Sequence, residues 1–321
     1  MRLMRGKVRF LSCLACLALF ACKVEGFPDQ DDAGGVPDAR PRHDAAQVVY
    51  PDAGMANGDL VAQVGSDTTL DIGCWNIEQF PKQSTTAAAL ADLIASMDLD
   101  VVAVEEINDE AAFNQVIARL PGWKGALGEG NHGAGGQIPP QRVGFFWKES
   151  VAQLTETKAL FTTSSYEFPR PPFQATVTAG AKTFTLIAVH LKAGIAAEDQ
   201  ERRRLAHVTL EGYMRNLPNP VLLCGDFNQE IYGEPDAGTG TIYAPYLADS
   251  ARYRMLSAPL DRSGAITFLD YSNMLDQMIA TSGLDPMVAS EAPVIPQLDD
   301  QYSAYHTVVS DHLPLVIRLH P

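Results

Sequence analysis

Short apolar segments that end on acidic, amide or imidazole side chains recur from residue 69 to the C-terminal end of the sequence. Their length and their content of Val, Ile, Thr and aromatic residues predict strands. The expected strands are Thr69–Ile77, Val101–Ile107, Val143–Lys148, Gln174–Thr178, Thr183–His190, Pro220–Cys224, Leu275–Thr281 and Pro314–Leu319. Helical segments are expected at 84–97, from 107 to Leu120 and at 197–217. Strands mixed with helices predict an α/β or α+β domain.

Two of the connections carry turn signals. Ala179-Gly180 separates two expected strands and predicts a hairpin. The segment Gly125–Pro140 is rich in glycine and is expected to be a loop.

The N-terminus has the composition of an export signal. Its first nine residues carry four Lys or Arg side chains and no acid, and the apolar run Phe10–Ala21 follows. A permanent membrane helix needs about 20 apolar residues, so a signal peptide is the better interpretation. Leu19–Cys22 resembles the bacterial lipobox, which predicts lipidation of Cys22, with Cys13 and Cys16 as rival positions. The expected product is an exported, membrane-anchored lipoprotein that faces the periplasm or the cell exterior.

Three regions are expected along the chain. Residues 1–22 form the signal peptide, 23–66 a disordered tether with repeated Pro-Asp-Ala units, and 67–321 the folded domain. The tether has too few apolar side chains to offset the entropy of ordering it.

The chain is acidic, with 39 Asp and Glu against 24 Lys and Arg and a formal net charge of −15. This charge works against sequence-independent binding to nucleic acid, which depends on Lys and Arg neutralising phosphates. It does not exclude a nuclease whose metal ion supplies the local positive charge.

Cys74 and Cys224 are the two cysteines beyond the leader. Each lies two positions before a polar residue near a strand end, so both are expected to face the same interior. Export would permit a disulfide, but two buried small apolar side chains are the preferred interpretation.

The segment Gly225–Asn228 places Asp226 and Asn228 two positions apart where an apolar strand ends. Two such oxygens can enter one cleft and suit a hard cation such as Mg²⁺. An Asx turn would explain the same residues without any chemistry. Similar residues recur in the same setting: Asn76, Glu105, Glu106, His190, Asp276, Asp311 and His312. Adjacent strand residues point to opposite faces, so only one of Glu105 and Glu106 is expected to enter the cleft.

Taken in order, these segments resemble the endonuclease/exonuclease/phosphatase superfamily, whose fold is shared with deoxyribonuclease I. The matching stretches are Trp75-Asn76-Ile77, Val104-Glu105-Glu106-Ile107, Val189-His190-Leu191-Lys192, Gly225-Asp226-Phe227-Asn228, Leu275-Asp276 and Ser310-Asp311-His312. The resemblance implies a four-layer α/β/β/α sandwich with two mixed β-sheets.

The resemblance also implies roles for these residues. Glu106 would be the principal metal ligand, with Asn76 and Asp311 on the metal side. His312 would deprotonate the attacking water or stabilise the phosphoryl group, and Asp276 would orient it. Asp226 and Asn228 would position the water and a phosphate oxygen. His190 would contact phosphate or protonate the leaving oxygen.

The resemblance thus predicts a metal-dependent phosphoesterase that cleaves phosphodiester bonds, DNA or RNA among its candidate substrates, or phosphomonoester bonds. Mg²⁺ is the expected cofactor, with Mn²⁺ or Ca²⁺ as alternatives, and a monomer is expected. The competing hypothesis is a non-catalytic, surface-anchored binding protein that retains the fold.

Overall fold

The computed structural model describes residues 60–130, 141–232, 241–288 and 292–321. All of them belong to the second of the chain's two units, His43–Pro321. The predicted leader, the lipidation site Cys22 and residues 23–59 of the predicted tether lie outside the described residues. Within those described ranges, no helix has the length and apolar character needed to cross a bilayer.

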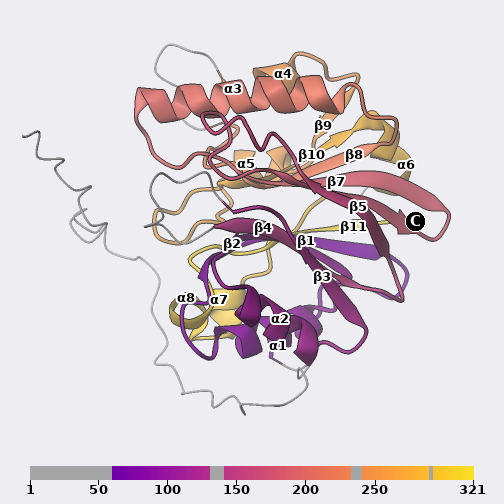
Figure 1. The fold of residues 1–321 in the computed structure, drawn as a ribbon, viewed down its shortest axis with the longest axis vertical. Helices are drawn as coiled ribbons and strands as arrows, with labels where there is room; N and C mark the ends of the chain where they lie inside the picture. The colour runs from indigo at the N-terminus through magenta and orange to yellow at the C-terminus, as the bar shows by residue number, and fades with distance from the viewer. Residues whose placement is uncertain (1–59, 131–140, 233–240, 289–291) are drawn as a thin grey trace, which may run out of the picture. The chain divides into compact units, whose positions relative to one another are not determined.

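Two mixed β-sheets form the centre of the unit (Figure 1). The five-stranded sheet has the order β11-β1-β2-β4-β3 and the six-stranded sheet the order β5-β6-β7-β8-β10-β9. The strands are β1 Leu70–Phe80, β2 Val101–Ile107, β3 Trp123–Leu127, β4 Arg142–Lys148, β5 Gln153–Ala159, β6 Phe173–Ala179, β7 Lys182–His190, β8 Val221–Asp226, β9 Tyr253–Met255, β10 Asp276–Thr281 and β11 Leu315–Leu319. The pairs β1–β2 and β7–β8 are parallel, and the other pairs within the sheets are antiparallel.

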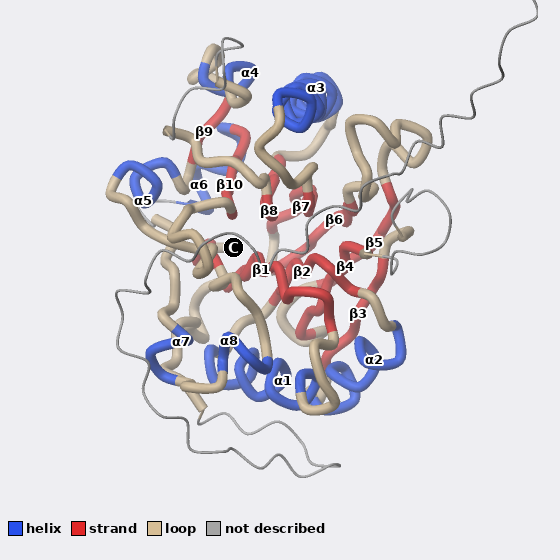
Figure 2. The backbone as a smooth tube through the Cα atoms, turned by 90° about the vertical axis from the view of Figure 1, so that its left-hand side faces the viewer, coloured by secondary structure: helices blue, strands red, loops and turns tan. Residues whose placement is uncertain are grey.

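Helices cover the outer face of each sheet, which gives the α/β/β/α layers seen edge-on in Figure 2. The helices are α1 Thr86–Met97, α2 Glu110–Arg119, α3 Ala197–Met214, α4 Ala244–Leu247, α5 Ala258–Arg262, α6 Asp285–Val288, α7 Leu298–Gln301 and α8 Tyr305–Val308, with a 3₁₀ turn η3 at Ser282–Leu284. Buried residues of α1, α2, α7 and α8 pack on the five-stranded sheet, and those of α3, α4 and α5 on the six-stranded sheet. The predicted fold class is therefore confirmed.

Strand alternation separates the apolar side chains into three cores. On β2, Val101 and Ala103 join the core between the sheets, whereas Val102 and Val104 join the core under α1 and α2. On β8, Leu222 and Cys224 face the first core and Leu223 faces α3. Because both faces of these strands are buried, the sequence shows continuous apolar runs there.

Three expectations need correction. Gly125–Leu127 is part of strand β3, because these residues pair with β4. Glycine is needed at residue 125 because a Cβ there would lie 2.5 Å from Ile117 Cδ1 of α2. Strand β5 was not predicted, since it is a polar edge strand with few buried positions. Residues before 67 are also part of the folded unit, because Leu60, Val61 and Val64 pack against the core under α1.

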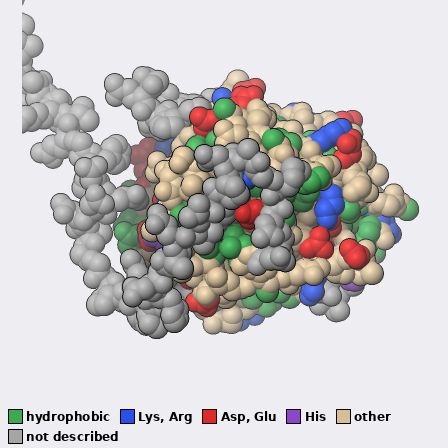
Figure 3. Space-filling view, turned by 90° about the horizontal axis from the view of Figure 1, so that it is seen from below, with side chains coloured by type: hydrophobic (Ala, Val, Ile, Leu, Met, Phe, Trp, Pro, Cys, Tyr) green, Lys and Arg blue, Asp and Glu red, His purple; other side chains and the backbone are tan. Residues whose placement is uncertain are grey.

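Acidic and basic side chains are interspersed over the described part of the face seen in Figure 3. That face therefore presents a mixed-charge surface of the kind found on soluble proteins.

Candidate active site

Strands β1, β7 and β8 each carry a polar side chain directly beyond the core between the sheets. On each strand the residue two positions earlier belongs to that core; these pairs are Cys74/Asn76, Ala188/His190 and Cys224/Asp226. Since every second strand residue points the same way, the polar groups continue the inner faces of both sheets. Asp226 is also the register partner of His190 on β7 and of Asp276 on β10.

Gly225 explains why glycine precedes Asp226. It has a φ of 140°, and a Cβ there would lie 1.9 Å from the carbonyl oxygen of Val189 on the neighbouring strand. Any side chain would push β8 away from β7, so glycine is required for Asp226 to lie beside His190.

Asp226 lies at the centre of a compact polar group. Asn76 donates from Nδ2 to Asp226 Oδ2 at 3.0 Å and to Glu106 Oε1 at 3.3 Å. His190 Nε2 lies 3.5 Å from Asp226 Oδ2 and 3.8 Å from Glu106 Oε1. Burial raises the pKa of Asp226 to about 6, which the charge of His312 partly counters.

Glu105 and Glu106 point in different directions. Glu106 has a φ of 64°, lies where the pairing of β2 is irregular and accepts a hydrogen bond from the backbone of Gln79. This irregularity turns Glu106 toward Asn76 and His190. Glu105 is fully buried, and burial followed by the charge of Asp276 raises its pKa well above the ordinary value.

His312 is held by Asp276. The His312 Nδ1 and Asp276 Oδ2 atoms are 2.8 Å apart, and both residues are buried. The Nε2 atom lies 3.9 Å from Asp226 Oδ2 and 3.9 Å from Asp311 Oδ1. Burial alone would lower the pKa of His312, but the three carboxylates outweigh it and raise the pKa to about 10. His312 is therefore an imidazolium at neutral pH.

The pKa of His190 is shifted in the opposite direction. Burial, and then the positive charges of Arg170 and His312, lower its pKa well below the ordinary value. A neutral imidazole and an imidazolium thus lie on two sides of Asp226, which gives the site two different hydrogen-bond donors.

Asp311 and Glu106 are the two carboxylates on the expected metal side of the site. Asn76 turns its Nδ2 toward Glu106, and its Oδ1 accepts a hydrogen bond from the backbone N–H of Glu78 at 3.0 Å. Burial, with the charges of Glu78 and Glu106, raises the pKa of Asp311 to about 7 even though His312 opposes the change. Its Oδ1 atom is buried without a hydrogen bond. Carboxylates that repel one another beside an unsatisfied oxygen fit a divalent cation. Among the described residues no three His, Cys, Asp or Glu side chains form a compact metal-binding group, so a cation would complete its shell with water and substrate. Asn76 Oδ1 could join that shell only by leaving the Glu78 N–H.

Asn228 takes part in the Asx turn and also lies in the candidate site, so the two interpretations of Gly225–Asn228 do not exclude each other. Its backbone N–H donates to Asp226 Oδ1 at 2.8 Å, which is an Asx turn, and its φ is 53°. Its Nδ2 donates to the carbonyl of Leu191 at 3.2 Å. The turn orients Asp226 and leaves Asn228 Oδ1 as its remaining acceptor.

Arg170 is a site residue that sequence reasoning left without a role. Its guanidinium donates to Gln141 Oε1 at 2.8 Å and to the Leu191 carbonyl at 2.9 Å. Burial lowers its pKa, and the charges of Glu106 and Asp226 act in the opposite direction. The sequence signal that could have identified Arg170 is its position between Pro169 and Pro171, because prolines stiffen the loop that carries it.

Arg203 is a second buried arginine, one of the three consecutive arginines in the first turns of α3. It is 2 % exposed and donates to the carbonyls of Lys192 and Gly194 and to Gln229 Oε1, at 2.7 to 2.8 Å. It therefore fixes the segments that follow His190 and Asn228. Lys192, two residues beyond His190, pairs with Asp199 at 2.8 Å.

The two cysteines beyond the leader, Cys74 and Cys224, are free thiols and are fully buried between the sheets.

The structure brings the eight residues to which the resemblance gave roles into one connected group that spans both sheets. They are Asn76, Glu106, His190, Asp226, Asn228, Asp276, Asp311 and His312.

Comparisons with known proteins agree with this architecture. The model of the endonuclease/exonuclease/phosphatase family matches residues 73–271. A comparison with curated protein sequences finds no match.

Among solved structures, three illustrate the similarity. TDP2 of D. rerio with a single-strand DNA product is 15 % identical, with a TM-score of 0.57 over 79 % of this chain and 100 % of that one. The catalytic domain of human nocturnin is 17 % identical, with a TM-score of 0.57 over 78 % and 93 %. The mannosyl-6-phosphatase of Bacteroides thetaiotaomicron is 13 % identical, with a TM-score of 0.52 over 78 % and 99 %. At these identities the likeness shows the fold alone.

Proposed function

The chain belongs to the endonuclease/exonuclease/phosphatase family, and on that premise we propose that it is an exported, metal-dependent phosphoesterase. It hydrolyses a phosphodiester or a phosphomonoester bond. The observation that carries the proposal is the position of His312, held at Nδ1 by Asp276 while Nε2 faces Asp226 and Asp311. A fixed imidazolium beside carboxylates and an amide is suited to hold a phosphoryl group between them.

The pKa values divide the roles between Asp226 and His312. Asp226, with a pKa of about 6, is ionised at neutral pH and basic enough to take a proton from the attacking water. His312, with a pKa of about 10, already carries its proton and stabilises the negative oxygens of the phosphoryl group. Of the two roles that the resemblance allows His312, charge stabilisation is therefore the one we propose.

The other side chains of the site orient Asp226 and neutralise charge on the phosphate. Asn76 holds the Asp226 carboxylate through Nδ2. Neutral His190 donates a hydrogen bond to a phosphate or leaving oxygen, and Arg170 adds a second positive charge close to Glu106 and Asp226. Asn228 keeps Asp226 in its rotamer and offers its amide oxygen to the water.

Glu106, Asp311 and, once its amide turns its oxygen away from the Glu78 N–H, Asn76 would hold the metal ion, for which we propose Mg²⁺, with Mn²⁺ or Ca²⁺ as alternatives. When bound, such an ion neutralises charge on the phosphate oxygens. Their hard oxygen atoms, and the absence of thiolate or imidazole among the three, suit these cations.

Hydrolysis assays test the proposal. Purified domain should cleave at least one of supercoiled DNA, RNA and small phosphate esters with Mg²⁺ present and lose that activity in EDTA. Absence of turnover on every substrate would overturn it. Asp226→Asn should lower kcat/KM by about 10² or more, whereas Asp285→Asn, which changes an exposed ion pair with Arg254, should leave it unchanged. A change of less than about threefold in Asp226→Asn would refute its role as base.

We also propose that lipid on Cys22 anchors the enzyme at the periplasmic or outer surface of a membrane. The support is the sequence of the leader. The Cys22→Ala variant should appear in the soluble fraction, and unchanged membrane retention would refute lipidation at this position.

A further inference from the structure

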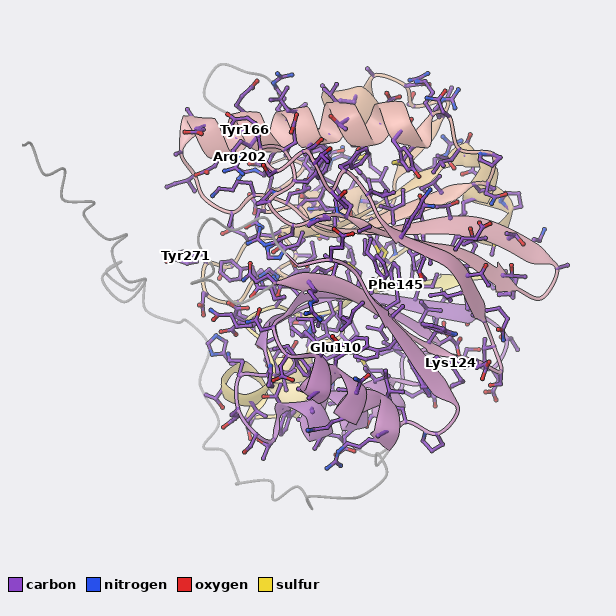
Figure 4. The ribbon with its side chains drawn as sticks, in the orientation of Figure 1. Glu110, Lys124, Phe145, Tyr166, Arg202 and Tyr271 are labelled. Carbon is purple, nitrogen blue, oxygen red and sulfur yellow. The ribbon has the colours of Figure 1, made fainter. Side chains whose placement is uncertain are left out.

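Three rings lead from the candidate active site to the surface. The Phe268 ring lies 4.8 Å from the His312 ring, with an interplanar angle of 35°. The Tyr271 ring stacks on Phe268 at 5.6 Å and 29°. Phe268 is half-buried between the other two, and Tyr271 is 57 % exposed. In Figure 4 Tyr271 lies at the same end of the sandwich as Arg202 and Tyr166.

The backbone keeps these rings in place. Phe268 forms isolated bridges with both Asn273 and His312. Leu269 donates its backbone N–H to the carbonyl of Asp311 at 2.8 Å. The short turn that carries Tyr271 is therefore tied at its base to the two residues that form part of the phosphate site. A ring fixed in this way loses little entropy when a ligand stacks on it.

Tyr271 differs from the other exposed tyrosines. Arg202 lies over the Tyr166 ring at 5.0 Å, and Arg262 lies over the Tyr232 ring at 4.4 Å. No cation of the described residues covers Tyr271, so a face of its ring remains available. An open aromatic face fixed beside a phosphate site suits a flat ring attached to that phosphate.

We propose that Phe268 and Tyr271 form a stacking subsite for a nucleobase of the substrate. This inference rests on the proposed phosphoesterase function and narrows it to phosphate esters of nucleosides. The scissile phosphate lies at His312, and the base of an adjoining nucleoside stacks on the exposed face of Tyr271. An alkyl or sugar phosphate lacks the flat π surface and gains nothing from this platform.

Matched dinucleotides test the subsite. The substrates are a thymidine dinucleotide and two analogues in which one base or the other is replaced by hydrogen. Tyr271→Ala should lower kcat/KM for the full dinucleotide by about 5- to 150-fold, chiefly through KM. It should change kcat/KM for one of the analogues by less than about twofold. Tyr271→Phe, which keeps the ring, should match the wild type on all three. Tyr232→Ala is the control on a tyrosine outside the row.

The outcomes separate the two proposals. Equal losses on all three substrates, or no loss on any, would overturn the subsite and leave the phosphoesterase function standing. If no phosphate ester is turned over, the function fails, and calorimetric titration with thymidine 5′-monophosphate and with inorganic phosphate still tests the subsite. Tyr271→Ala should then weaken binding of the nucleotide and leave binding of phosphate unchanged; equal affinity for the nucleotide in both proteins would overturn it.

Discussion

His312 and Asp276 are joined across the two sheets by a single 2.8 Å hydrogen bond. His312 lies just before β11 of the five-stranded sheet, and Asp276 begins β10 of the six-stranded sheet. Neither sheet alone can form this pair, so the charge state of the candidate site depends on their packing.

Asp276→Asn should move the alkaline limb of the pH–activity profile to lower pH. In the proposed mechanism His312 acts while protonated, so activity of the wild type falls as pH rises through its pKa of about 10. Without the Asp276 charge that pKa falls, and the loss of activity begins at lower pH. At pH 7 kcat/KM should fall by about 10² or more.

The measurement is kcat/KM from pH 5 to 11 on one substrate. An alkaline limb that stays in place in Asp276→Asn would contradict the assignment of His312 as the charged donor. Asp285→Asn, on the surface, controls for a general loss of charge.

Glu106→Gln should raise the Mg²⁺ concentration for half-maximal activity by about tenfold or more, because a neutral amide replaces the principal carboxylate. The neighbouring substitution Glu105→Gln is the matched control, since Glu105 is fully buried and contacts Cys74 between the sheets. Titration of activity with Mg²⁺ after removal of metal by EDTA checks both variants. An equal shift in the two variants would refute the assignment of Glu106.

Arg203→Lys should lower kcat by about tenfold with little change in KM. A lysine keeps the charge but lacks the two guanidinium nitrogens, of which one donates to the carbonyls of Lys192 and Gly194 and the other to Gln229. The loops after His190 and Asn228 should then lose their fixed spacing. Arg204→Lys is the control, because Arg204 pairs with Glu201 near the surface.

Gln229→Ala removes only the side-chain acceptor of this network. It should reproduce part of the loss in kcat and cause little further loss when combined with Arg203→Lys. Fully additive effects in the double variant would indicate that Arg203 does not act through this segment.

His207→Phe should make stability less dependent on pH. The His207 ring packs among Phe227, Tyr243 and Tyr246, and its two nitrogens have no hydrogen bond within the described residues. Burial and the charge of Arg203 lower its pKa from 6.5 to about 3. Since the unfolded chain binds a proton first, stability is full above about pH 6.5 and declines as pH falls toward 3.

At pH 5 this one histidine should cost roughly 2 kcal/mol relative to neutral pH. Denaturant unfolding at pH 7 and pH 5 would measure the difference, which should shrink in His207→Phe and persist in the surface variant His320→Gln. An undiminished pH dependence in His207→Phe would refute the prediction.

The strand ends were predictable because alternation and length are local properties of the sequence. Asn76, His190 and Asp226 were recognised as polar residues at or near the ends of apolar strands, and the structure adds that all three share the inner face. Alternation alone would place Glu105, in phase with Val101 and Ala103, on the inner face. Glu106 turns toward Asn76 because of its positive φ, which was not visible in the sequence.

Other features depend on partners distant in the chain. Arg170 reaches the site only because residues 161–172 return beside Leu191. Arg203 is buried by the loops after β7 and β8, whose positions no helical periodicity reveals. The short helices α4 to α8 are each four or five residues long and are stabilised by packing and not by propensity.

The shared inner face of Asn76, His190 and Asp226 has a consequence for how such genes can change length. Removing one codon within β8 would rotate Asp226 toward α3 and bring its neighbour into the site, whereas removing two would preserve its direction and shorten its reach. Insertions in the surrounding loops, whether of an odd or an even number of residues, do not change the direction of these side chains. Natural length variation should therefore accumulate between the strands and not inside them.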